Sequence, residues 1–422
     1  MSGGESQRLK MTKHLNSAIS DVLYIFDEPS VGLHPEDLVG ISEIFHRLKA
    51  KGNTLVLVDH DPDIIRLADY VIELGPKAGV NGGKLTYQGG YKNFLLSDTV
   101  TARALREPHQ LKRTTAAFTE IYSLNQVSRF NIVNQSVKIP KNALTVVSGV
   151  AESGKSTLMR TLFTEKYPEA IVFDQSPIRG SRRSNLLTYL DVFQVIRRNY
   201  AKLSGKSASL FSFNGKGGCP VCHGKGYIKF DLAYMGDVQQ TCEKCRGKRY
   251  NDEALSTKWK GKSIDQLLQL TVSEGLSFID LPEVQQVLSA LSEANLDYIT
   301  IGQSLDTLSG GERQRLKIAA KLLASTVQDA SIFILDEPST GLHESDIKQL
   351  QRLLEKLNNQ QKTLIVLEHN LGIISQADWL IDMGPKGGSQ GGKVLFQGVP
   401  EDLLTIKDSF TGKHLKRYLE KA

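Results

Sequence analysis

The stretch Gly149-Val-Ala-Glu-Ser-Gly-Lys-Ser-Thr157 decides the fold class of this 422-residue chain. It fits the pattern Gly-x-x-x-x-Gly-Lys-Ser/Thr, in which backbone N–H groups at a helix N-terminus cradle the phosphates of a nucleotide. The preceding run ALTVVSG predicts a buried strand, and the following run STLMRTLF predicts a helix. A glycine loop that matches by chance is the alternative. The flanking segments favour a phosphate loop in an α/β nucleotide-binding fold.

The residues of this loop have distinct expected roles. Lys155 is expected to reach the β- and γ-phosphates of ATP, and Ser156 is expected to bind Mg²⁺. The expected nucleotide contacts are Gly149, Glu152, Ser153, Gly154, Lys155, Ser156 and Thr157. Glu152 is unusual here, because a carboxylate close to phosphates repels them. We therefore expect Glu152 to weaken the affinity for ATP.

Two acids follow a second apolar run, SIFILDEPS (331–339), which predicts a buried strand. Asp336 is expected to hold Mg²⁺ through water. Glu337 is expected to act as the general base that polarises the attacking water, an effect of roughly 10²–10⁴ in rate. His369 ends the apolar run TLIVLEH and is expected to sense the γ-phosphate. Gln175, after another apolar run, is expected to position the metal or the water, although a lone glutamine there is otherwise a surface amide.

An internal repeat divides the chain. YIFDEPSVGLH (24–34) recurs as FILDEPSTGLH (333–343), an offset of 309 residues. Ser2, Gly3, Gly4 and Glu5 form the signature of an ATP-binding cassette, and this signature recurs at Ser309. The front copy has no phosphate loop ahead of its signature. The sequence therefore predicts one full cassette preceded by the back half of another, as if incomplete at the N-terminus relative to its own repeat.

The repeat also suggests a domain division. We expect a partial first lobe over 1–106, a linker over 107–117, a second lobe over 118–196 and 263–422, and an insert over 197–262. Asp27, Glu28 and His60 of the first lobe repeat the acids and the histidine of the second. Because no phosphate loop accompanies them, we expect them to have a structural role.

All four cysteines lie in the insert. Cys219-x2-Cys222 and Cys242-x2-Cys245 are separated by 19 residues, the spacing of a structural four-thiolate Zn²⁺ site. Disulfides are the alternative, which the expected cytosolic location disfavours. His223 adjoins Cys222, but with four thiols available it is expected not to be a ligand.

Positive charge is concentrated around these cysteines. From Arg197 to Lys262 there are 14 Lys and Arg residues against five Asp and Glu residues, in a chain of net charge +6. The segment SPIRGSRRSN (176–185) adds three arginines. Aromatic residues, which are candidates for stacking on bases, lie between them: Tyr200, Phe211, Phe213, Tyr227, Phe230, Tyr234, Tyr250 and Trp259. Several of these are expected to be core residues. The insert is a candidate nucleic-acid surface, and a solvated basic face is the alternative.

The sequence gives no sign of a membrane protein. No apolar run approaches the roughly 18 residues that cross a bilayer, and the N-terminus lacks the charged and then apolar pattern of a secretory signal. We therefore expect a cytoplasmic protein without a membrane partner.

The order of five motifs identifies a resemblance. DQSPI at Asp174, SFN at Ser212, the cysteine module, GKRYN at Gly247 and IGQSLDTLSGGERQR at Ile301 resemble the UvrA family, the excinuclease A subunit of bacterial nucleotide excision repair. The resemblance covers nearly all 422 residues. It implies an ABC-type ATPase that uses ATP, Mg²⁺ and Zn²⁺, forms a homodimer, binds damaged double-stranded DNA and hands it to a helicase partner. Ser2, Gly3, Gly4 and Glu5 would close the nucleotide site of the second lobe.

Departures from the family leave alternatives open. The first phosphate loop, the first zinc module, the domain that binds the helicase partner and the insertion domain of the family have no counterpart in this sequence. One alternative is an excinuclease-A-like drug-resistance ATPase. Another is a zinc-stabilised DNA-binding module with little ATP turnover. A third is an ATPase that acts on ribosomes or on a membrane partner, which would not need the cysteine module.

Overall fold

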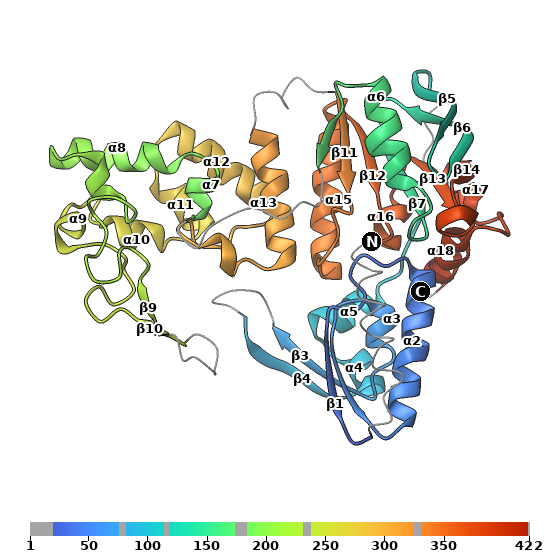
Figure 1. The fold of residues 1–422 in the computed structure, drawn as a ribbon, viewed down its shortest axis with the longest axis horizontal. Coiled ribbons are helices and arrows are strands. Elements are labelled where there is room, and N and C mark those ends of the chain that lie inside the picture. Colours follow the sequence, from blue (N-terminus) through green and yellow to red (C-terminus); the bar gives the residue numbers. More distant parts are fainter. Residues whose placement is uncertain are drawn as a thin grey trace. The chain divides into compact units, whose positions relative to one another are not determined.

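The computed structural model describes residues 20–75, 82–113, 118–173, 184–230, 238–323 and 331–420, which form two compact units (Figure 1). The first unit takes Met1–Gln175 and Ser325–Ala422, and the second takes Ser176–Ala324. Within the first unit we distinguish a front lobe, residues 20–113, from a back lobe, residues 118–173 and 331–420. In these described ranges, no helix has both the length and the apolar character needed to cross a bilayer.

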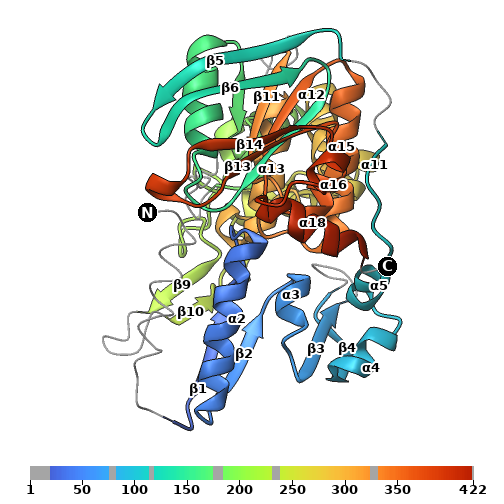
Figure 2. The ribbon, with the colours of Figure 1, turned by 90° about the vertical axis from the view of Figure 1, so that its right-hand side faces the viewer.

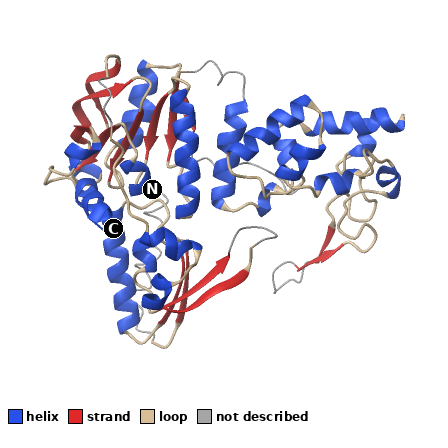
Figure 3. Ribbon diagram, turned by 180° about the vertical axis from the view of Figure 1, so that it is seen from behind, coloured by secondary structure: helices blue, strands red, loops and turns tan. Residues whose placement is uncertain are grey.

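A six-stranded sheet forms the centre of the back lobe (Figure 3). Its strand order is β14 (Lys393–Gly398), β13 (Trp379–Gly384), β7 (Leu144–Gly149), β12 (Thr363–Leu367), β11 (Ile332–Asp336) and β8 (Ile171–Phe173). All neighbours run parallel except β13 and β14. Every residue of β7, β11 and β12 is buried, as their continuous apolar runs predicted. Because these strands are parallel, the phosphate loop, the two acids and His369 all emerge at one edge of the sheet.

A β-hairpin and a helix cover one face of this sheet. The hairpin consists of β5 (Ile121–Arg129) and β6 (Ile132–Pro140), and the helix is η2 (Thr157–Phe163), which continues into α6 (Thr164–Lys166). η2 has π-type hydrogen bonding and lies where the sequence predicted a helix. Helices α15 (Glu344–Asn359), α16 (Leu371–Ser375) and α18 (Phe410–Glu420) also contact β7. The short helices η5 (Gly388–Gln390) and α17 (Pro400–Leu403) complete the described back lobe.

The front lobe repeats the second half of this fold. Its elements are β1 (Leu23–Asp27), α2 (Pro35–Ala50), β2 (Thr54–Val58), α3 (Pro62–Ile65), β3 (Tyr70–Gly75), β4 (Lys84–Gly90), α4 (Tyr91–Leu96) and α5 (Val100–Arg106). β1 and β2 pair in parallel like β11 and β12, and β3 and β4 pair antiparallel like β13 and β14. In the back lobe β7 lies between the two pairs, whereas the described front lobe contains two separate two-stranded sheets.

One face of the front-lobe strands is exposed. Ile25 of β1 and Ile72 of β3 are 66% and 65% exposed, whereas their repeat counterparts Ile334 and Ile381 are both 0% exposed. In the back lobe, those counterparts lie in one cluster with η2 and the β5–β6 hairpin. The exposed set is Leu23, Ile25, Val56, Val58, Tyr70, Ile72, Leu74 and Leu85. The two lobes share one apolar pattern, but only the described back lobe supplies the elements that cover it.

The second unit is largely helical and has its own core. Its elements are α7 (Leu186–Tyr189), α8 (Phe193–Ser204), η3 (Ala208–Phe211), β9 (Tyr227–Phe230), β10 (Val238–Thr241), α9 (Asp252–Ser256), α10 (Ile264–Leu268), α11 (Val272–Phe278), α12 (Pro282–Glu293), η4 (Leu305–Thr307) and α13 (Gly310–Leu323). One apolar cluster joins Leu187 and Phe213 to Leu288 and Leu316. This unit is therefore larger than the expected insert, residues 197–262. The division into domains made from the sequence stays a prediction.

Candidate nucleotide site and four-cysteine centre

The phosphate loop connects the end of β7 to η2. Gly149 has φ 133°, and a Cβ atom there would lie 2.1 Å from the carbonyl oxygen of Met383, so only glycine fits at this position. Ser153 Oγ is buried and has no hydrogen-bond partner among the described atoms. An unpaired buried hydroxyl is costly, and a phosphate oxygen would satisfy it. The loop therefore fits the phosphate groups expected from its sequence.

Lys155 is buried and folds over the loop. Its Nζ donates hydrogen bonds to the carbonyl oxygens of Gly149 and Val150, at 2.6 and 2.9 Å. Burial lowers the pKa of Lys155 to about 8, although Glu337 and other acids act in the opposite direction. Phosphates bound in the loop would supply negative charge that favours the protonated ammonium group.

Asp336, the last residue of β11, is paired with an arginine. Its Oδ2 accepts a hydrogen bond from Arg160 Nη1 of η2 at 2.7 Å. Burial raises the pKa of Asp336, and the Arg160 guanidinium acts against this shift. In this structure Arg160 therefore balances the charge of the carboxylate that the sequence assigned to Mg²⁺.

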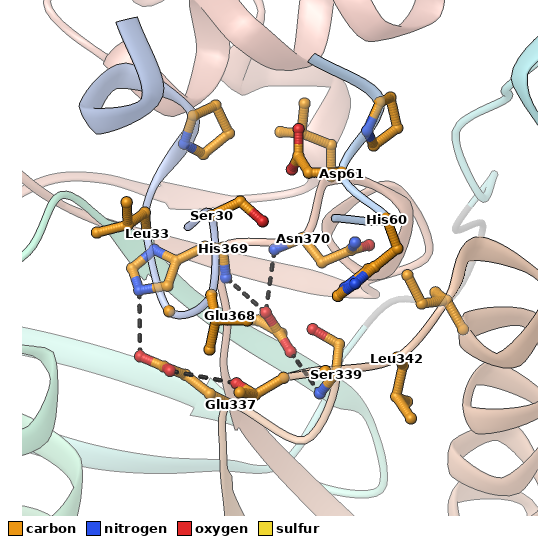
Figure 4. Close-up of a pocket in the computed structure, with 18 of the residues that line it drawn as sticks. Ser30, Leu33, His60, Asp61, Glu337, Ser339, Leu342, Glu368, His369 and Asn370 are labelled. Carbon is orange, nitrogen blue, oxygen red and sulfur yellow. Dashed lines mark hydrogen bonds and ion pairs between the residues drawn. The ribbon is translucent and has the colours of Figure 1, made fainter. Parts of the chain in front are cut away.

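The structure places the other two candidate catalytic side chains next to each other (Figure 4). Glu337 Oε1 lies 3.3 Å from His369 Nε2. Burial lowers the pKa of His369 well below its ordinary value, so the ring facing Glu337 is neutral. Glu368 accepts hydrogen bonds from the backbone N–H groups of Ser339, His369 and Asn370, at 2.9, 2.6 and 3.0 Å. Glu368 thus fixes the segment that carries His369 against the turn after β11.

The front lobe lines one side of the pocket around these residues (Figure 4). The labelled front-lobe residues are Ser30, Leu33, His60 and Asp61. Asp59 accepts a hydrogen bond from the Ser30 backbone N–H at 3.0 Å, just as Glu368 does from Ser339 at 2.9 Å. The two lobes therefore meet through turns that are equivalent in the repeat.

Five predicted site residues lie outside the described ranges. They are Ser2, Gly3, Gly4 and Glu5 of the first signature, and Gln175. The second signature begins α13, where Ser309 Oγ accepts a hydrogen bond from the Glu312 backbone N–H at 3.2 Å. Tyr298 donates its hydroxyl to Glu312 Oε1 at 2.8 Å. This second signature thus forms a capped helix start in the second unit.

The acids of the front lobe lie in a different environment from those of the back lobe. Asp27 and Glu28 are exposed, whereas Asp336 is buried and Glu337 is half-buried. The described front-lobe residues include no phosphate loop beside them. Their structural role stays a prediction.

Glu152 gives a direct test of the phosphate loop. It is exposed and has φ 58°, a conformation that favours glycine. We expect Glu152→Gly to tighten ATP binding about tenfold, because it removes a like charge beside the triphosphate. Isothermal titration of the nucleotide-free protein with ATP measures this change. Glu152→Gln is the matched control, since it removes the charge and keeps the backbone conformation. If neither variant binds ATP more tightly, Glu152 does not oppose binding.

The four cysteines form one buried cluster. The Sγ atoms of Cys219, Cys222, Cys242 and Cys245 all lie within 4.8 Å of one another, and none forms a disulfide. Cys222 Sγ and Cys245 Sγ are 3.6 Å apart. A tetrahedral Zn²⁺ site with Zn–S bonds of about 2.3 Å has S···S edges of roughly 3.8 Å. The thiols therefore fit Zn²⁺, and the exposed His223 is not part of this group.

Most of the aromatic residues considered for base stacking are core residues. The buried ones are Tyr200, Phe211, Phe213, Tyr250 and Trp259. Arg249 is also structural, because its guanidinium lies 3.7 Å from the centroid of the Phe213 ring and its Nε donates to the Gly224 carbonyl oxygen at 2.9 Å. Phe230 on β9 is exposed, and Tyr234 lies outside the described residues. The expectation that several of these rings are core residues is therefore confirmed, and the five buried rings are not available for base stacking in this structure.

Sequence reasoning missed several polar residues of the first unit. Arg160 and Glu368 hold the site residues, and a buried set of hydrogen bonds joins His34 to Thr411 and Asp382. The repeat carried a signal for Glu368, because an acid precedes the histidine in both copies. It carried no signal for Arg160, which lies in a segment without a repeat partner.

Comparisons with known proteins agree on one family. The family model described as ABC transporter matches residues 132–340. The whole chain is 39% identical to the UvrABC system protein A of Lactococcus lactis subsp. lactis (strain IL1403) and to that of Aquifex aeolicus (strain VF5), and it covers 48% and 49% of those proteins. The chain thus spans about half the length of the curated relatives it matches.

A solved structure supports the same assignment. The crystal structure of UvrA2 from Deinococcus radiodurans has a TM-score of 0.87 and 36% identity, over 99% of this chain and 54% of that one. A model of ribosome-bound archaeal Pelota and ABCE1, at 20% identity and TM-score 0.52, shares the fold alone. The ABC-type α/β fold predicted from the phosphate loop, the cassette signature and the family resemblance is confirmed. The chain belongs to the UvrA family of ABC-type ATPases.

Proposed function

We propose that this chain is an ATP-gated, DNA-binding ATPase of nucleotide excision repair that acts in the cytoplasm. One observation carries the proposal. A phosphate loop, two acids and a histidine meet at one edge of a sheet, in a chain that also has a cluster of four cysteines and aligns over its full length with UvrA proteins. The combination of ATPase and cysteine cluster favours this function over that of an ATPase without a nucleic-acid partner.

The residues of the back lobe support an ATPase mechanism. The backbone of the phosphate loop and Lys155 would bind the triphosphate, while Ser156 and Asp336 would hold Mg²⁺, which supplies charge neutralisation for phosphoryl transfer. Glu337 would orient and polarise the attacking water. Its neighbour His369 would donate a hydrogen bond toward the γ-phosphate. Ser2 to Glu5 of the first signature and Gln175 would complete this site.

The second unit would bind DNA. Zn²⁺ held by the four thiolates would stabilise the fold of the module, whose excess of Lys and Arg would contact the phosphates of damaged double-stranded DNA. By resemblance to the family, the chain would act as a homodimer and deliver DNA to a helicase partner. ATP binding would tighten the grip on DNA, and hydrolysis would release it.

A second candidate is a zinc-stabilised DNA-binding module with little ATP turnover. Two observations favour it: the carboxylate of Glu152 in the phosphate loop, and the apolar face of the front-lobe strands that the described residues leave exposed. An excinuclease-A-like drug-resistance ATPase is a variant of the main proposal, in which the DNA that the protein binds carries a DNA-binding drug.

Steady-state ATP hydrolysis by the purified chain tests the proposal. It should be measured at fixed salt, with and without duplex DNA that carries a bulky adduct. We expect DNA-stimulated turnover that disappears in Lys155→Ala. DNA binding without turnover would favour the second candidate. Turnover restored only by adding a polypeptide that carries the front half of a cassette would show that the front lobe needs a partner polypeptide.

A further inference from the structure

His34 of the front lobe is fully buried against the back lobe. The Glu36 backbone N–H donates to His34 Nδ1 at 3.1 Å, so the ring proton must be on Nε2. Nε2 donates to Thr411 Oγ1 at 3.1 Å, and Thr411 in turn donates to Asp382 Oδ1 at 2.7 Å. Burial lowers the pKa of His34 well below its ordinary value, which keeps this tautomer neutral. The three side chains form one directed chain of hydrogen bonds from the front lobe into the back lobe.

The repeat contains the reciprocal chain. His343 of the back lobe is the counterpart of His34, and its Nε2 lies 2.9 Å from Thr101 Oγ1 of the front lobe. Thr101 donates to Glu73 Oε1 at 2.8 Å, and Glu73 is the repeat counterpart of Asp382. Each lobe thus has a histidine that contacts a threonine of the other lobe, and that threonine donates a hydrogen bond to an acid of its own lobe. Of these two crossed contacts, the His34 contact joins the start of α2 to α18 (Figure 2), and the His343 contact joins the start of α15 to α5.

Of these two sets of hydrogen bonds, only the one that begins at His34 reaches a phosphate loop among the described residues. Ser148 Oγ lies 3.1 Å from Thr411 Oγ1, and Ser148 is the last residue of β7 before Gly149. Ser148 is also paired in register with Asp382 of the neighbouring strand β13. Thr411 therefore joins the front-lobe histidine to the residue on which the phosphate loop begins. The Thr101 chain has no such neighbour in the part of the front lobe that the structure describes.

We propose that His34 is a positioning residue for the phosphate loop of the other lobe. By donating to Thr411 it fixes the base of the loop, so that docking of the front lobe and binding of nucleotide favour each other. The coupling to nucleotide rests on the ATP site of the proposed function, whereas the ordering of the loop does not.

Two isosteric substitutions separate this role from general contact between the lobes. Thr411→Val and Thr101→Val each remove one hydroxyl from a crossed contact, and only the first also loses Ser148. Two measurements are needed: the dissociation constant for a fluorescent ATP analogue, and amide hydrogen exchange of residues 150–157 in the nucleotide-free chain. We expect Thr411→Val to weaken nucleotide binding about tenfold and to speed exchange in the loop, and Thr101→Val to change the affinity by less than about twofold.

Two substitutions of His34 itself test whether its hydrogen-bond donor is what matters, because one keeps a donor and the other removes it. Glutamine keeps a donor near the Nε2 position, so His34→Gln should behave like the wild type, whereas His34→Met should behave like Thr411→Val. Equal effects of Thr411→Val and Thr101→Val, or an unchanged loop in Thr411→Val, would overturn the proposal. If the wild type shows no ATP binding that depends on Lys155, the proposed function fails, and loop exchange alone then decides the role of His34.

Discussion

Glu337→Gln is expected to lower kcat for ATP hydrolysis by roughly 10²–10⁴-fold. Glu337 is the half-buried acid at the end of β11, and its Oε1 lies 3.3 Å from His369 Nε2. Glutamine has the same size but cannot accept the proton of the attacking water. ATP binding should persist, because the phosphate loop and Lys155 are unchanged. Turnover and the dissociation constant for ATP, measured on the same preparation, test both parts of the prediction.

The repeat supplies a matched control for this substitution. Glu28 occupies the equivalent position after β1, with φ 47° against 45° for Glu337. It is exposed and has no described phosphate loop beside it. Glu28→Gln should therefore leave kcat within about twofold of the wild type. Equal losses in the two variants would mean that these acids act through the contact between lobes, and an active Glu337→Gln would remove Glu337 from the catalytic role.

The central strands could be predicted from the sequence because each one is marked by its own continuous run of apolar residues. The runs that became β7, β11 and β12 are apolar without alternation, which is typical of parallel strands covered on both faces. The front-lobe runs have the same composition, yet Ile25 and Ile72 are exposed. Burial of a strand depends on elements elsewhere in the chain, and a strand's own sequence does not reveal whether they are present. The similarity of the strands in the two lobes was therefore predictable, and the difference in their burial was not.

The candidate site could be predicted where one motif holds the chemistry. The phosphate loop and His369 each follow a strand, Asp336 ends one, and parallel strands bring their carboxyl ends together. Arg160 and Thr411 could not be found in this way, because their roles depend on contacts between distant parts of the sequence. Arg160 contacts Asp336, which is 176 positions away, and Thr411 contacts His34, which is 377 positions away. The buried aromatic rings of the second unit failed as stacking candidates for a related reason: sequence gives their number but not their burial.

Loss of the proposed Zn²⁺ should unfold the cysteine module, the other large effect that we expect. The four thiols form a cluster in which Ile228 is the partly buried apolar residue packed against them, so little apolar surface stabilises this segment. Apparent free energies of Zn²⁺ binding in small zinc modules are about 10–16 kcal/mol, comparable to the total stability of about 5–15 kcal/mol of a domain. Cys222→Ser should therefore lower the zinc content and expose residues 219–245 to proteolysis. Metal analysis and limited proteolysis with mass spectrometry measure both effects.

His223→Ser is the matched control, because His223 adjoins Cys222 but is exposed and lies outside the thiol cluster. It should keep one Zn²⁺ per chain and the proteolytic pattern of the wild type. The back lobe has its own apolar cluster around η2, so ATP binding should survive in Cys222→Ser. Under the proposed function, DNA affinity at fixed salt should fall, because the Lys and Arg residues of the module would no longer be held by a folded segment. A Cys222→Ser protein with full zinc content would show that three thiolates suffice, whereas one without zinc but with an intact module would show that protein contacts alone stabilise the fold.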